Sequence, residues 1–172
     1  QLSHCLHNNN TGKRREAIRL VNTSTNNADL NLTSISGVNS VEVSSSSQNV
    51  DVTNITGADT KLLATANTGT GVERVNFEFK AADLVGTSTD IDLTLTSNSG
   101  DVTVQQSAAG AGIDSATITA IGTNSGGSYI GAAANLETLT VKGAGSLVIA
   151  AADMTALTTL DATANSGGVT YN

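Results

Sequence analysis

Apolar and polar residues alternate with a period of two along most of the chain. Residues 41–43, 50–52 and 102–104 are examples in which a polar residue stands between two valines. This alternation places apolar side chains on one face of an extended strand. The segments are short, and clusters of Gly, Asn, Ser and Asp, such as residues 98–101 and 165–168, separate them. From residue 28 onward the pattern therefore predicts an all-β domain of short strands.

One template of seven positions recurs within this region: a turn residue followed by apolar, polar, any, apolar, polar and apolar positions. The copies cover residues 37–43, 71–77, 112–118 and 135–141, with a shorter echo at 157–162. Most of the intervals fit a unit of roughly 21 residues that carries occasional longer loops, which lies in the range of known repeat lengths. Repeats of this length with two strands each are typical of a solenoid, in which each coil buries its apolar side only against its neighbours.

These patterns together predict a β-solenoid, a β-helix-like coil of about seven rungs, over residues 28–172. At the ordinary spacing between strands its length is roughly 35 Å. The absence of proline from the chain agrees with this fold, because proline cannot donate to a strand ladder. A β-sandwich is the alternative, since short strands at regular intervals suit it as well.

Residues 1–27 differ from the rest and are expected to form a basic arm or linker. Residues 1–20 contain both histidines, Cys5 and four of the eight basic residues. A short helix capped by Thr11 is conceivable, but basic residues in its first turn would oppose the helix dipole. The chain begins with Gln and shows no export signal, so we expect an internal piece or a processed chain.

Charge and composition exclude several classes of function. The net charge is −7, and 14 of the 15 acidic residues follow residue 20. Such a body repels nucleic acid, whose binding requires several cationic contacts to phosphate. No apolar run approaches the length of a membrane-spanning helix, so no membrane insertion is expected. The single cysteine excludes an intramolecular disulfide.

The template, the Ser/Thr/Ala/Asn-rich strands and the Leu157-Thr-Thr-Leu-Asp-Ala162 echo are similar to the repeat regions of RTX-type bacterial S-layer proteins and type I-secreted surface adhesins. The similarity extends over roughly residues 30–172. It implies export to the cell surface, a calcium-stabilised β-solenoid and self-assembly into a lattice. The chain lacks the Gly-Gly-x-Gly-x-Asp nonapeptide that holds calcium in RTX repeats, so no ligand is assigned from the resemblance.

Carboxylates near turns are the candidate metal ligands. Asp90 and Asp92 flank Ile91, so the alternation of a strand places both on one face, where their charges repel unless solvent or a cation screens them. Asp101 follows a Ser-Gly turn. Calcium binds six to eight oxygen atoms, which carboxylates, carbonyls and waters supply. These three residues are the predicted calcium ligands, with solvated surface acids as the alternative.

Threonine pairs of the form Thr-x-Thr recur at residues 94–96, 117–119 and 138–140. On a flat solenoid face they would form an array of hydroxyl and methyl groups. Such an array resembles the surface of ice-binding β-solenoids, although outward threonine is common on strands.

Catalysis has little support in the sequence. Both histidines lie in the predicted arm, and no nucleophile elbow or phosphate-binding loop is present. Paired acids are able to hydrolyse glycosides, but four aromatic residues provide little to grip a sugar. We therefore expect no enzyme, but a self-associating structural component of an extracellular bacterial surface layer, with cell-surface polysaccharide as a further partner. A cell-surface adhesin or an ice-binding protein is the alternative.

Overall fold

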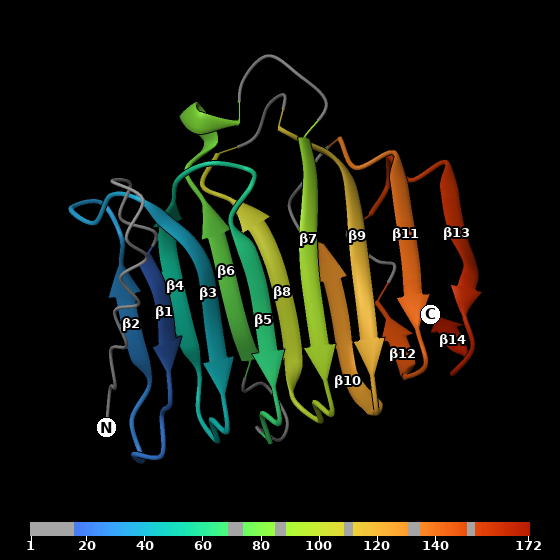
Figure 1. Ribbon diagram of the computed structural model, residues 1–172, viewed down its shortest axis with the longest axis horizontal. Coiled ribbons are helices and arrows are strands. Elements are labelled where there is room, and N and C mark those ends of the chain that lie inside the picture. Colours follow the sequence, from blue (N-terminus) through green and yellow to red (C-terminus); the bar gives the residue numbers. More distant parts are fainter. Residues whose placement is uncertain (1–15, 69–73, 85–88, 109–111, 131–134, 151–153) are drawn as a thin grey trace, which may run out of the picture.

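The computed structural model describes residues 16–68, 74–84, 89–108, 112–130, 135–150 and 154–172, which wind into a β-solenoid (Figure 1). Its strands form two seven-stranded sheets in which each strand pairs in parallel with the next strand but one along the chain. The first sheet contains β1 (Glu16–Leu20), β3 (Val38–Ser44), β5 (Lys61–Thr65), β7 (Thr89–Thr96), β9 (Ile113–Ile121), β11 (Thr138–Gly143) and β13 (Thr159–Asn165). The second contains β2 (Ala28–Asn31), β4 (Val50–Ile55), β6 (Arg74–Phe79), β8 (Asp101–Gln106), β10 (Thr123–Ile130), β12 (Ser146–Ile149) and β14 (Val169–Tyr171). A 3-10 turn, η1 (Ala81–Asp83), precedes β7.

This arrangement confirms the predicted all-β solenoid. The two sheets are formed by alternate strands of one continuous coil, and every pairing within them is parallel. Parallel pairing between strands n and n+2 is what stacked coils produce, whereas an immunoglobulin-like sandwich pairs its strands antiparallel.

Strand β1 lies within the stretch assigned from sequence to the basic arm. It pairs with β3, with Ile18 opposite Val41. Ile18 and Leu20 are buried and alternate with exposed Arg19, so the period-2 pattern begins earlier than residue 28. The Arg19 side chain contacts the neighbouring strand, where its Nε lies 3.4 Å from Glu42 Oε2. Residues 1–15, with Cys5 and both histidines, lie outside the described residues.

The coils differ in length although the sheets are regular. Successive partners along one column of the first sheet are Ile18, Val41, Leu62, Leu93, Ile118 and Val141, and their spacing along the chain is uneven. Three copies of the sequence template overlap β3, β9 and β11 of the first sheet, but the copy at 71–77 ends within β6 of the second sheet. The template therefore detects apolar alternation rather than position in the coil.

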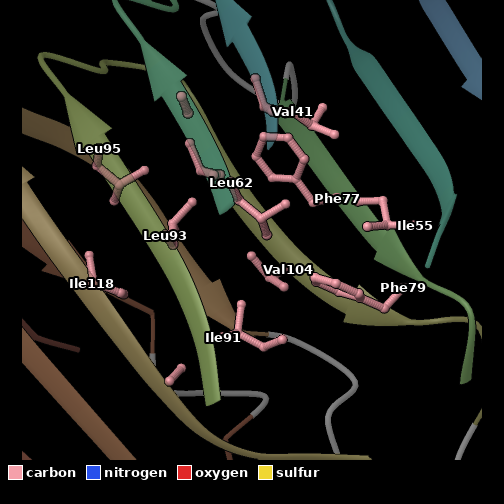
Figure 2. Packing of buried hydrophobic residues seen from close by; sticks show 14 of the residues in the cluster. Val41, Ile55, Leu62, Phe77, Phe79, Ile91, Leu93, Leu95, Val104 and Ile118 are labelled. Carbon is pink, nitrogen blue, oxygen red and sulfur yellow. The ribbon is translucent and has the colours of Figure 1, made fainter. Parts of the chain in front are cut away.

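The core is a narrow seam of stacked apolar columns between the two sheets. One column of the second sheet runs from Val52 through Phe77 to Val104, and the facing column of the first sheet includes Leu62 and Leu93. All five side chains are buried. Figure 2 shows the Phe77 ring between the two sheets, near Val41 and Leu62. Each coil thus covers the apolar side of the next, which agrees with the modest apolar content of the chain.

The corners after β3, β5 and β7 each contain a residue in the left-handed conformation. These residues are Ser45, Ala66 and Ser97, with φ angles of 51°, 51° and 52°. Each directs its backbone N–H to the carbonyl of the next coil; the N–H of Ala66, for example, donates to Thr96 O at 2.8 Å. Left-handed geometry is unfavourable for residues other than glycine. The hydrogen bonds between stacked corners offset that cost.

Glycine is required where the last corners approach more closely. A Cβ atom on Gly145 would lie 2.5 Å from the carbonyl oxygen of Gly122. A Cβ atom on Gly167 would lie closer still to the carbonyl carbon of Gly145. Backbone atoms cannot yield at such distances without separating the coils, so Gly145 and Gly167 cannot be replaced by a residue that has a Cβ atom.

Candidate functional surfaces

A ladder of buried polar side chains lines the turns that lead from the first sheet to the second. We call it the asparagine ladder. Its members are Asn22, Ser46, Asn67, Asn98 and Asn124, which are at most 3% exposed. The side-chain oxygen of each later member accepts the backbone N–H of the member one coil earlier. The four distances, from Asn22 N to Asn98 N, are 2.9, 3.0, 3.1 and 3.1 Å.

The amide groups of the ladder also satisfy strand carbonyls. Asn67 Nδ2 donates to Val43 O at 3.0 Å, and Asn98 Nδ2 donates to Ala64 O at 2.7 Å. Asn124 Nδ2 donates to Ser146 O at 3.0 Å. An unpaired polar group is costly when it is buried. The ladder supplies hydrogen-bond partners to the backbone groups at the corners, so these groups can be buried away from water. Its role is structural.

The sequence pattern places Asn98 in a turn cluster and Asn22 in the predicted arm, and it does not reveal the ladder. A signal was present, since a polar residue follows the ends of β1, β3, β5 and β7 at the second position in each case. Asparagine is so common in turns that position alone does not distinguish a buried amide from an exposed one.

The structure brings two of the three predicted calcium ligands onto the same face. Asp90 and Asp92 are exposed on the outer face of β7, and Ser115 Oγ on β9 donates to Asp90 Oδ1 at 3.2 Å. Asp101 belongs to β8 in the second sheet. Its Oδ1 accepts the backbone N–H of Gly127 at 2.7 Å. In the described ranges, no three Asp, Glu, His or Cys side chains gather as a metal cluster.

The outer face of β7, β9 and β11 carries a hydroxyl patch. Its members are Thr94, Thr96, Ser115, Thr117, Thr119, Thr138 and Thr140, all half-buried. The register pairs Thr94 with Thr119 and Thr117 with Thr140, so successive Thr-x-Thr pairs are displaced by one pleat of the strand rather than stacked directly.

Other side chains end the rows of this patch. Thr96 pairs with Ile121, Thr119 pairs with Lys142, and Thr140 pairs with Asp161. Hydroxyl groups continue on the flanking strands, because Thr96 also pairs with Thr65 on β5 and Thr138 pairs with Thr159 on β13, but the apolar and charged residues interrupt the rows.

A polar row crosses the outer face of the second sheet. It runs through Asp29, Asp51, Asn76 and Thr103 on β2, β4, β6 and β8. Asn76 and Thr103 are 3% and 2% exposed, and Asn76 Oδ1 and Thr103 Oγ1 have no hydrogen-bond partner. On the same face Gln105 Nε2 donates to Glu78 Oε2 at 3.1 Å.

The last coil, formed by β13 and β14, exposes residues whose equivalents are buried one coil earlier. Leu160 pairs with buried Leu139 but is 38% exposed, and Tyr171 pairs with buried Ile149 but is 47% exposed. Asp161 accepts hydrogen bonds from the side chain and the backbone N–H of Thr163, which hold the pKa of this carboxyl below its usual value. Core-facing apolar side chains of this coil are therefore partly exposed to solvent.

No family model, curated protein or solved structure matches the chain. Within the described residues there is no helix of the length and apolarity needed to cross a membrane. The molecule is thus characterised by its own geometry, a β-solenoid with a buried asparagine ladder and a hydroxyl patch on the outer face of its first sheet.

Proposed function

We propose that the chain is a structural component of an extracellular bacterial surface layer that self-assembles and catalyses no reaction. The observation that carries this proposal is the fold itself: in the described residues each coil pairs in parallel with its neighbours, and the two sheets present broad outer faces. Stacked repeats provide extended surfaces of this kind for contact with other chains.

The broad faces of the solenoid support the same proposal. Threonine, serine and acidic side chains cover the outer surfaces of β7 and β9. Such faces suit contact with water and with the hydroxyl groups of cell-surface polysaccharide. The resemblance to S-layer and adhesin repeats agrees with a location at the cell surface.

The proposal predicts ordered assemblies of the purified chain. Concentrating it in the presence of calcium should give sheets or lattices in negative-stain electron micrographs. A monomeric, dispersed chain at every concentration, with and without calcium and cell-wall polysaccharide, would contradict the proposed function. Release of reducing sugar from polysaccharide would indicate an enzyme instead.

Calcium enters this proposal through Asp90 and Asp92, because Asp101 lies in the other sheet and already accepts a backbone N–H. Calcium should raise the melting temperature by several degrees relative to chelator, since a ligand that binds only the folded state stabilises it. The double variant Asp90→Asn/Asp92→Asn should lose this increase. The control Asp101→Asn should keep it, although it should melt at a lower temperature in both conditions.

Equal melting curves with calcium and chelator would remove calcium from the proposal. Loss of the calcium response in Asp101→Asn alone would instead place the ion at the second sheet. Circular dichroism or scanning calorimetry measures the unmodified chain and both variants under identical salt.

The hydroxyl patch is the observation that favours the alternative functions, a cell-surface adhesin or an ice-binding solenoid. Seven half-buried hydroxyl side chains lie on three adjacent strands of one sheet face. Thermal hysteresis that is lost in Thr117→Lys and retained in Leu160→Lys would favour ice binding over the surface-layer proposal. Binding to a cell-surface polysaccharide without assembly would favour an adhesin.

A further inference from the structure

Two buried oxygen atoms on the outer face of the second sheet have no hydrogen-bond partner. They are Asn76 Oδ1 on β6 and Thr103 Oγ1 on β8, and the two residues stand opposite each other in the register. Both residues are buried almost completely. Buried polar atoms in native proteins are paired in the great majority of cases, so two adjacent exceptions point to a partner that the protein itself does not supply.

A third oxygen group stands next in the same row. Asp51 on β4 is opposite Asn76, so Asp51, Asn76 and Thr103 occupy consecutive positions on three adjacent strands of the sheet (Figure 1). The Asp51 side chain is half-buried, and within the described residues no hydrogen bond or ion pair engages its carboxylate. Asp29 follows on β2 and is exposed, so solvent reaches the row from that side. We call Asp51, Asn76 and Thr103 the oxygen row.

The charge of this face favours a cation over a neutral hydrogen-bond donor. Strands β2, β4, β6 and β8 contain four acidic residues and one basic residue, Arg74. Arg74 belongs to a different row, where it is opposite Asp101. A carboxylate that is partly removed from water is stabilised by a neighbouring positive charge. Carboxylate and amide oxygens are the ligands that hard metal cations prefer.

The spacing of the strands and the number of carboxylates select the ion. Adjacent strands lie about 4.8 Å apart, so an ion between them is about 2.4 Å from an oxygen on each side. This distance suits calcium, at roughly 2.3–2.6 Å, but exceeds the roughly 2.1 Å of magnesium. Sodium has nearly the radius of calcium and a single charge, which the one carboxylate of Asp51 balances. Calcium would leave an uncompensated charge beside buried Asn76.

We infer that the oxygen row binds a sodium ion on the outer face of the second sheet. The ion lies between β4 and β6, with the Asp51 carboxylate and Asn76 Oδ1 as its protein ligands, and water completes its coordination. A water bound to the ion donates to Thr103 Oγ1. The site is separate from Asp90 and Asp92, which belong to the first sheet, and it does not depend on the proposed function.

Melting curves at equal ionic strength test the site. Sodium chloride and tetramethylammonium chloride screen surface charges alike. Sodium at about ten times its dissociation constant should raise the melting temperature by about 4 °C over tetramethylammonium, and the larger potassium ion should raise it less. Asp51→Asn should abolish this increase. The control Asp114→Asn changes another half-buried carboxylate, on β9 of the first sheet, and should keep the increase.

A change of ion preference is the more specific test. Asn76→Asp places a second carboxylate opposite Asp51, so a divalent ion becomes the better match for the row. The variant is made in the Asp90→Asn/Asp92→Asn background, which removes the calcium candidates of the first sheet. Calcium should raise the melting temperature of this triple variant by several degrees and leave that of the background unchanged.

The sodium NMR line gives a readout that does not depend on unfolding, because a bound sodium ion broadens it. Thr103→Val removes an unpaired buried hydroxyl and nearly preserves its shape, so it should not lower the melting temperature in tetramethylammonium, and it should weaken sodium binding about threefold. This variant decides the question if Asp51→Asn does not fold.

Three results would overturn the inference. The first is equal melting in both salts without line broadening, which would mean that water alone occupies the row. The second is a sodium response that is unchanged in Asp51→Asn, which would mark it as an effect of bulk salt. The third is a calcium response that persists in Asp90→Asn/Asp92→Asn and disappears with Asp51→Asn, which would make the ion divalent. Each of these results leaves assembly of the chain, and so the proposed function, to its own test.

Discussion

Replacing Phe77 with alanine should lower the free energy of unfolding by about 4 kcal/mol, within the range of buried Phe→Ala substitutions. Phe77 is fully buried and stands between Val52 and Val104 in the central part of the second sheet. Its ring fills the seam between the sheets (Figure 2). The seam is narrow and its walls are hydrogen-bonded sheets, so they cannot move inward to fill the space left by the ring.

Thermal unfolding followed by circular dichroism measures this loss. A fall in melting temperature on the order of 10 °C is expected for a chain of this size. Phe77→Leu is the matched control: it keeps most of the volume and should lose less than about 1.5 kcal/mol. Equal melting temperatures for the unmodified chain and Phe77→Ala would show that the seam is not packed as described.

Replacing Asn98 with alanine should cost about 3 kcal/mol, from two buried groups left without partners at roughly 1–3 kcal/mol each. Asn98 Oδ1 accepts both the backbone N–H and the side-chain amide of Asn67, and Asn98 Nδ2 donates to Ala64 O. Alanine removes these bonds at a corner where the groups remain dry. The substitution therefore interrupts the asparagine ladder at its centre.

The matched variant for this position is Asn98→Ser. At Ser46 a hydroxyl already takes the ladder position and accepts the N–H of Asn22 at 2.9 Å. Serine at 98 should recover the bond to Asn67 N–H but not the bond to Ala64 O, so its loss should be about half that of alanine. Hydrogen exchange provides a local readout, because the N–H of Asn67 should exchange faster in Asn98→Ala. Equal stability of all three proteins would contradict a structural role for the ladder.

The fold could be predicted from the sequence because each repeat of a solenoid contacts only its neighbouring repeats. Alternation in segments such as 41–43 and 102–104 identifies strands, and the recurrence of one template along the chain indicates a repeat architecture. The alternation also holds at residues 17–20, where Ile18 and Leu20 flank Arg19. Its basic surroundings led to an assignment as an arm, but one exposed arginine among inward apolar residues is compatible with a strand.

The sequence was less informative about which residues become neighbours in the folded chain. Asp90 and Asp92 share a face because strand periodicity requires it. Asp101, further along the chain, lies in the opposite sheet because a turn intervenes. The Thr-x-Thr pairs share a face as expected, yet their register is displaced because loop lengths between strands vary. Sequence spacing cannot reveal a displacement that depends on the path of each loop.

Alternation and composition were enough to predict the class of architecture, the polar character of the strands' outward positions and a net charge unfavourable for binding nucleic acid. Two further features became apparent only in the folded structure: the asparagine ladder and the close glycine contacts at the last corners. These depend on contacts between residues that are distant in the sequence. The geometry of stacking, rather than the chemistry of any one segment, creates such contacts.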